Sequence, residues 1–247
     1  MMKTHIHIAV LEMGILPEAL EEKHGHFFSM IQTWLGAAAQ EAMVEISFQR
    51  FSICNRDDLP QAEAFDAYVI SGSKHSVYED LPWIHDSKLF LNELRHKNIP
   101  MFGICFGHQL MAEAFGGKVE KSSKGWGFGT DTYQFADGQS QEVLVVHQDQ
   151  VVVLPETAHV IGQSAHCEYG ALEYDFAAKS TQFHPEFNPA LVQDLLLQYQ
   201  DTVGIDQAQA ALAHLPSACL NNQAFAQEVI AFFQTNLANL SCANRSQ

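Results

Sequence analysis

The sequence is short of basic residues. It holds 13 lysine and arginine residues against 29 aspartate and glutamate residues, which gives a formal net charge of −16 at pH 7. No run of lysine or arginine is long enough to follow a phosphate backbone or an anionic lipid surface. We therefore expect neither nucleic acid nor a membrane among its partners, and we attribute the acidity to a well-solvated surface.

Cysteines are few, and long apolar runs are missing. The five cysteines are odd in number, widely spaced and without a Cys-x-x-Cys pair: Cys54, Cys105, Cys167, Cys219 and Cys242. This pattern predicts neither a disulfide framework nor a metal site, and it fits a reducing cytoplasm. No window approaches the roughly 18 apolar residues that a bilayer span requires, and the first residues resemble a strand rather than a signal peptide. We expect a soluble, cytoplasmic protein.

The composition is that of a globular α/β protein. Of the 247 residues, 47% are hydrophobic and 17% are charged, which is enough to bury a sizeable core. The sequence has no repeats, low-complexity tracts or linkers rich in glycine and proline. We therefore expect a single domain over residues 1–247.

Strand and helix patterns alternate through the first half of the chain. Short apolar runs predict strands at 6–10, 44–51, 67–70 and 100–104, and helical spacings of apolar residues predict helices at 17–39, 83–96 and 107–115. This alternation predicts parallel strands joined by right-handed crossovers.

The second half of the chain has a different pattern of apolar residues. Residues 118–174 contain six short strand patterns broken by glycine, aspartate and proline, which predicts a β-rich, partly antiparallel excursion. Helical patterns return at 189–199, 208–215 and 225–237. We interpret residues 201–247 as a C-terminal helical extension that packs on the core, with a homodimer or partner surface as the alternative.

One cysteine lies between two nearby glycines at the point where a strand ends. Residues 103–109 read Gly-Ile-Cys-Phe-Gly-His-Gln and lead into the expected helix. Cys105 would therefore lie at the carboxyl end of a parallel strand, where open α/β sheets place their sites. Gly103 and Gly107 permit a tight strand-to-helix turn, and the helix N-terminus favours a thiolate. Taken alone, this pattern also fits a cysteine that is merely packed.

A His-Pro-Glu unit offers the base that a thiol nucleophile needs. It lies within Gln-Phe-His-Pro-Glu-Phe at 182–187, after another strand pattern. Pro185 restricts the backbone so that His184 and Glu186 can project to the same side. His184 would take and return the thiol proton, and Glu186 would hold the imidazole in the right tautomer. Any single histidine among thirteen is more often structural, but its pairing with the Cys105 turn favours catalysis.

Together the two motifs resemble those of the class I (triad) glutamine amidotransferase family, the glutaminase module of GMP synthase, carbamoyl-phosphate synthetase and anthranilate synthase. The resemblance covers about residues 5–200. It implies a flavodoxin-like α/β fold with a mixed, mostly parallel sheet flanked by helices. It also implies that Cys105 is the nucleophile, His184 the general base and acid, and Glu186 the orienting carboxylate. No metal or organic cofactor is implied.

The resemblance extends to a loop after the strand at 67–70. Ser71-Gly72-Ser73-Lys74 aligns with the family's Ser-Gly-Gly-Pro loop, which implies an oxyanion hole built from the backbone N–H groups of Gly72, Ser73 and Phe106. Ser73 and Lys74 stand where the family has glycine and proline. We expect this departure to change the shape of the loop.

A substrate pocket is implied by further matches. Gln109 aligns with a substrate contact, and the segment 146–151 resembles a family segment that holds the amino-acid end of glutamine. The resemblance thus implies that Gln109, His147, Gln148 and Asp149 bind glutamine or a γ-glutamyl compound. The Gly-Trp-Gly stretch at 125–127 falls beside that pocket. A solvated strand end and a core tryptophan are the structural alternatives for these last two segments.

Three functions remain open on this basis. The protein could be a glutaminase subunit that forms a γ-glutamyl thioester and releases ammonia for a separate synthase. It could be a stand-alone hydrolase or peptidase acting on a γ-glutamyl amide or peptide, and the altered residues Ser73 and Lys74 favour this slightly. It could also be a non-catalytic binding or regulatory protein, but the complete set of Cys105, His184 and Glu186 argues against that.

Overall fold

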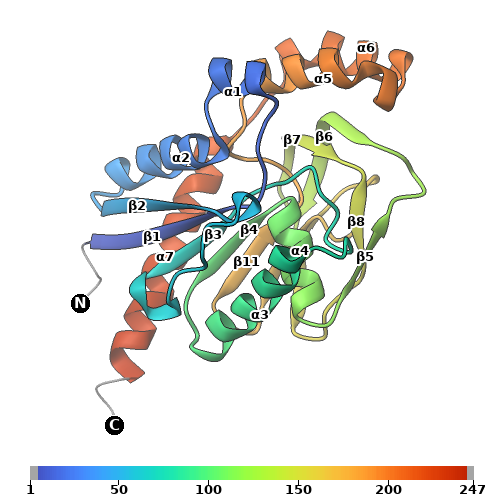
Figure 1. Cartoon of the computed structure of the whole chain (residues 1–247). Coiled ribbons are helices and arrows are strands. Elements are labelled where there is room, and N and C mark those ends of the chain that lie inside the picture. The colour runs from blue at the N-terminus through green and yellow to red at the C-terminus, as the bar shows by residue number, and fades with distance from the viewer. Residues whose placement is uncertain (1–4, 244–247) are drawn as a thin grey trace.

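The chain builds one large sheet with helices on both faces (Figure 1). The computed structural model describes residues 5–243, and it describes side chains for 5–240. The first half contains β1 (His5–Glu12), α1 (Glu18–His24), α2 (Phe27–Glu41), β2 (Glu45–Ser52), β3 (Ala67–Ile70), α3 (Pro82–His96), β4 (Met101–Ile104) and α4 (Phe106–Ala114). The second half contains β5 (Lys118–Lys121), β6 (Gly127–Phe135), β7 (Ser140–His147), β8 (Asp149–Val153), β9 (Ala158–Gln163), β10 (Ala171–Tyr174), β11 (Ala178–Thr181), α5 (Pro189–Val203), α6 (Ile205–His214) and α7 (Asn222–Ala243).

The strand order is β2-β1-β3-β4-β11-β10-β9-β6-β7, and β5 pairs with β8 in a separate small sheet. Strands β2, β1, β3, β4 and β11 run parallel. Strands β10, β9, β6 and β7 continue the sheet with antiparallel pairing. The predicted mixed α/β sheet flanked by helices is confirmed, and its antiparallel part comes from the β-rich segment.

Alternating side chains of β1 supply both halves of the core. Ile8 and Val10 pack on the face covered by α2 and α7, whereas Ala9 and Leu11 pack on the face covered by α3 and α4. This follows from the two-residue period of a strand that is buried on both faces. The carboxyl ends of β1, β3, β4 and β11 therefore meet at one edge, held between two layers of helices.

The single helix predicted at 17–39 is wrong, because the chain breaks into α1 and α2. Gly25 has φ 84°, and the next residue, His26, is extended with φ −83° and ψ 160°. A positive φ suits glycine and ends a helix, so the apolar pattern runs on across a real interruption.

The C-terminal helices lie in two places. Helix α7 packs against α2, and its apolar residues are buried in the core: Phe225, Val229, Ile230, Phe233 and Leu237. Helices α5 and α6 instead gather with α1 along the upper edge in Figure 1. Asp194 joins α5 to α1 by accepting from Lys23 and His24, each at 2.6 Å. The side chain of Cys242 lies outside the described residues.

Candidate active site

Cys105 occupies a strained turn between β4 and α4. Its φ of 51° and ψ of −99° are unusual for a residue other than glycine, and such backbone strain costs on the order of 1–3 kcal/mol. The surrounding contacts hold it in place: its N–H donates to Thr181 O at 2.8 Å. A Cβ at Gly107 would lie 2.3 Å from Ile70 O, so only glycine lets α4 approach β3 this closely. The sulfur is thereby held at the carboxyl edge of the sheet, with 5% of the residue exposed.

His184 and Glu186 form a buried pair beyond the end of β11. His184 Nδ1 lies 2.8 Å from Glu186 Oε1, and the His184 N–H donates to Leu144 O at 2.8 Å. The ring of Phe187 stacks on the imidazole with centroids 4.0 Å apart and planes 10° apart. The imidazole is thus fixed by a carboxylate at one nitrogen and by an aromatic face.

The electrostatics of this pair favour a protonated imidazole. Burial by itself disfavours the imidazolium, but the Glu186 carboxylate and the nearby Cys105 sulfur outweigh it and raise the pKa of His184 to about 10. At neutral pH the imidazolium is therefore the expected form.

Gly72 touches both predicted reacting groups. A Cβ built there would lie 2.9 Å from His184 Cε1 and 3.8 Å from Cys105 Cβ. The preceding Ser71 is fully buried, and its hydroxyl accepts from Met13 N and donates to Gly72 O, each at 2.9 Å. The loop that follows β3 therefore lies against Cys105 and His184, and its hydrogen bond with Met13, just after β1, helps to hold it there.

The backbone donors expected for an oxyanion hole lie in this loop and at the start of α4. Within the described part of the chain, the N–H groups of Gly72 and Ser73 have no protein acceptor. Phe106 is the first residue of α4, where a helical N–H lacks an intrahelical partner. These three groups remain the predicted donors.

The four residues expected to bind substrate are placed differently from one another. Gln109 is buried, and its Nε2 donates to Asp149 O at 2.8 Å and to Gln182 Oε1 at 3.0 Å. The Asp149 carboxylate accepts hydroxyl hydrogen bonds from residues 76 and 78. Gln148 is partly buried, and its carbonyl accepts from Ser122 N at 3.0 Å. The structure thus links Gln109 and Asp149 directly and places Gln148 on the adjoining turn.

His147 ends β7 close to the predicted base. Burial, followed by the nearby His166 and His184, lowers the pKa of His147 to about 3, so its imidazole is neutral. A Cβ at Gly127 would lie 3.1 Å from both His147 Nε2 and His166 Cδ2. Gly127 therefore lies beside His147 and His166, while the Trp126 ring packs near Phe128 in an apolar cluster.

Two residues near the site were missed by sequence reasoning. His166 lies in the turn after β9 with its ring 5.8 Å from that of His147, and no local motif marks it. Phe187 directly follows the His-Pro-Glu unit, so its position next to Glu186 is the signal that could have found it. His166 reaches His147 through the packing of β9 near β7, whereas the contact of Phe187 with His184 is local.

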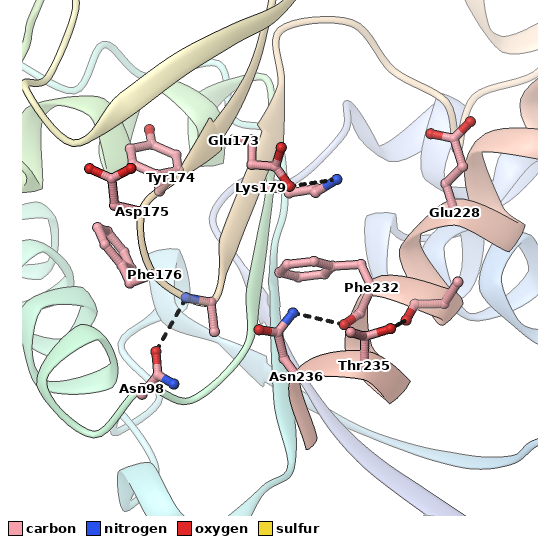
Figure 2. Close-up of a pocket in the computed structure, with 12 residues that line it drawn as sticks. Asn98, Glu173, Tyr174, Asp175, Phe176, Lys179, Glu228, Phe232, Thr235 and Asn236 are labelled. Carbon is pink, nitrogen blue, oxygen red and sulfur yellow. Dashed lines mark hydrogen bonds and ion pairs between the residues drawn. The ribbon is translucent and has the colours of Figure 1, made fainter. Parts of the chain in front are cut away.

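A groove of about 680 Å³ lies at the opposite end of the parallel strands (Figure 2). It is bounded by Asn98, by β10 and β11, and by α7, with the Glu173–Lys179 ion pair at 2.9 Å on its wall. Its lining contains neither cysteine nor histidine. The candidate active site is therefore the Cys105 edge rather than this groove.

The described residues gather no cluster suited to a metal ion. No group of three or more His, Cys, Asp or Glu side chains in that part of the chain is arranged to hold one. Among the same residues, no helix combines the length and the apolar character needed to cross a bilayer.

Known proteins of one family resemble this chain in sequence and in fold. The model of the family "Glutamine amidotransferase class-I" matches residues 27–198. γ-Glutamyl peptidase 2 of Arabidopsis thaliana is 27% identical over 72% of this chain and 75% of its own. GMP synthase of Desulfotalea psychrophila is 37% identical over 58% of this chain and 28% of its own. The crystal structure of a glutamine amidotransferase from Thermotoga maritima superposes with a TM-score of 0.69 at 18% identity, covering 94% of this chain and 98% of that one. The chain belongs to the class I glutamine amidotransferase family.

Proposed function

We propose that the protein hydrolyses the side-chain amide bond of a γ-glutamyl compound with Cys105 as the nucleophile. The observation that supports this most is the strained cysteine turn beside the buried His184–Glu186 pair. A thiol nucleophile needs a nearby base that takes its proton, and the base needs an orienting group. Backbone donors at the same edge are needed to stabilise the oxyanion.

The reaction follows from these positions. The Cys105 thiolate attacks the amide carbon, and the N–H groups of Gly72, Ser73 and Phe106 stabilise the resulting oxyanion, with about 2.7–4 kcal/mol for each such donor. The His184 imidazolium gives its proton to the leaving amine as the C–N bond breaks, which leaves a γ-glutamyl thioester. Neutral His184 then takes a proton from water, which attacks the thioester; glutamate leaves, and the thiolate–imidazolium pair is restored.

The buried Gln109 fits the amino-acid end of the substrate. Both hydrogens of its amide are donated to Asp149 O and Gln182 Oε1, so its own Oε1 remains an acceptor. An acceptor in this place suits the α-ammonium group of a γ-glutamyl substrate. The contact proposed for Gln109 is therefore a hydrogen bond from substrate to enzyme.

The leaving group separates two candidate functions. A glutaminase subunit would release ammonia for a separate synthase, as the similarity to a GMP synthase suggests. A stand-alone hydrolase would release a larger amine, as the similarity to a γ-glutamyl peptidase over three quarters of that protein suggests. Lys74, in place of the family's proline, is exposed and stands two residues from Gly72 in the loop beside Cys105. We favour the stand-alone γ-glutamyl hydrolase.

Steady-state kinetics on glutamine, γ-glutamyl amides and γ-glutamyl dipeptides would test this choice. We expect kcat/KM for the best dipeptide to exceed that for unassisted glutamine by about tenfold or more, since a binding difference of about 1.4 kcal/mol suffices. Glutamine as the best unassisted substrate would contradict the favoured function. Glutamine turnover that rises only with an added synthase would support the glutaminase subunit instead.

The pH dependence of kcat/KM should follow the ionisation of His184. Its pKa is raised to about 10, so kcat/KM is expected to fall as the pH rises through that value and the imidazolium loses its proton. Glu186→Gln removes the carboxylate that holds this pKa up, so the alkaline limb should shift to lower pH by at least about one unit. The rate should be measured from about pH 5 to 11 in both proteins, a range that brackets the raised and the ordinary pKa of histidine.

Asp175→Asn is the matched control for that shift. Asp175 pairs with His159 at 2.7 Å, and both side chains are exposed at the end of the sheet opposite Cys105. Its removal should leave the pH profile unchanged. An alkaline limb that stays in place in Glu186→Gln would show that Glu186 does not control the ionisation of His184.

A further inference from the structure

The loop at 71–79 is fastened to a distant strand by one carboxylate. Asp149 is the first residue of β8, and its Oδ2 accepts a hydrogen bond from Ser76 Oγ at 2.5 Å. Its Oδ1 accepts a second one from Tyr78 Oη at 3.1 Å. Both donors lie in the loop that carries Gly72 and Ser73, so two bonds from one side chain join elements that are remote in the sequence.

The backbone of Asp149 reaches the other side of the site. Its carbonyl accepts from Gln109 Nε2, which also bonds Gln182 Oε1 just after β11. Asp149 itself is held by the pairing of β8 with β5, opposite Lys121. The carboxylate is therefore attached to a well-anchored strand rather than to a second loop.

The loop gains no rigidity from proline. Lys74 stands where the resemblance places a proline, which would have fixed one backbone angle. Hydrogen bonds inside the loop include His75 N to Ser73 Oγ at 3.2 Å and Ser76 N to Glu79 Oε1 at 2.6 Å. Gly107 N donates to Ser71 O at 3.2 Å, and Lys88 Nζ donates to Val77 O at 2.8 Å. The two bonds to Asp149 add an attachment of the loop to β8.

Both carboxylate oxygens already accept a hydrogen bond from the loop, Oδ2 from Ser76 Oγ and Oδ1 from Tyr78 Oη. A carboxylate can accept about four such bonds, so kinetics must separate support of the loop from a substrate contact. The bond from Ser76 should be the stronger of the two because it is shorter and because Tyr78 is 49% exposed.

We propose that Asp149 is a positioning residue that holds the 71–79 loop, through Ser76 and Tyr78, so that the Gly72 and Ser73 N–H groups face the developing oxyanion. This rests on the proposed function. It differs from the substrate-binding role that the sequence implies for Asp149. A residue that acts in this way lowers kcat when it is removed, whereas a substrate contact raises KM.

The test compares Asp149→Asn with Ser76→Ala/Tyr78→Phe, using γ-glutamyl p-nitroanilide as substrate. Both variants should lose about tenfold or more in kcat with KM within about twofold, because each weakens the same support for the oxyanion donors. Combining all three substitutions should add little to the loss, since the groups act as a unit. A raised KM with unchanged kcat in Asp149→Asn would overturn the proposal, as would wild-type kinetics in the Ser76→Ala/Tyr78→Phe variant.

Hydrogen exchange separates this proposal from the proposed function. In both variants the hydrogen-bonded loop amides of His75, Ser76 and Glu79 should exchange faster than in the wild-type protein, whether or not the wild type turns over substrate. Unchanged exchange would overturn the positioning role. Absence of wild-type turnover together with faster exchange would instead remove the proposed function and keep the support of the loop. Asp137→Asn, in the exposed β6–β7 turn, is the control and should change neither measurement.

Discussion

Cys105→Ser is expected to lower the rate of γ-glutamyl amide hydrolysis by about 10⁴-fold or more while the protein stays folded. The proposed mechanism depends on a thiolate beside the His184 imidazolium, and a serine hydroxyl is a far weaker nucleophile near neutral pH. Serine is close to cysteine in size, so this 5% exposed position should accept it with little change in packing. Initial rates and circular dichroism would measure the two effects.

Covalent labelling gives an independent measure of the same variant. A chloroketone analogue of glutamine should modify wild-type Cys105 at a stoichiometry of one and should fail to modify Cys105→Ser. Cys219→Ser, at an exposed cysteine, should keep both activity and labelling. Equal labelling of Cys105→Ser and the wild-type protein would remove Cys105 from the proposed role.

The local parts of this site could be predicted from the sequence because they depend on short segments. An apolar strand followed by Gly-x-Cys-x-Gly specifies a tight turn, and the turn found at Cys105 has the positive φ that such a motif suggests. The spacing of His184 and Glu186 across a proline likewise allows their 2.8 Å contact. Each of these features involves only a few neighbouring residues.

The sequence pattern did not show which strands are neighbours in the sheet. His184 reaches the Cys105 edge because β11 pairs in parallel with β4, with Thr181 opposite Ile104, although the whole β-rich excursion separates the two strands in the chain. Periodicity identifies a strand but does not name its neighbour. For the same reason, neither the His166 position nor the bond from Ser76 to Asp149 could be foreseen.

The break at Gly25 is a local feature that the periodic pattern hid. The apolar spacing over 17–39 is helical on both sides of it, so a prediction based on periodicity joins α1 and α2. One backbone angle separates them, and it places the α2 N-terminus near the carboxyl end of β1, where Phe28 N donates to the buried Glu12 carboxylate at 3.1 Å. A single glycine is a weaker signal for ending a helix than the apolar periodicity on both sides of it is for continuing one.

Gly72→Ala should reduce kcat by about a hundredfold with little loss of stability. The new Cβ would lie 2.9 Å from His184 Cε1, a distance that requires one of the two groups to move. The imidazole is held by Glu186 and by the stacked Phe187 ring, so the loop that carries the predicted oxyanion donors would have to shift. A displacement of about 1 Å at a reacting centre can cost about 10²-fold in rate.

Gly36→Ala is the matched control for this substitution. Gly36 lies in α2, and an alanine Cβ there would meet no atom within 4 Å outside its own helix backbone and chain neighbours. Alanine at this position should therefore leave kcat unchanged and stabilise the helix by up to about 1 kcal/mol. Thermal unfolding and kcat measured on both variants separate a general effect of adding a methyl group from a local one. If Gly72→Ala keeps wild-type kcat, the contact between this loop and His184 does not limit the reaction, and the 71–79 loop can yield without moving the groups that stabilise the oxyanion.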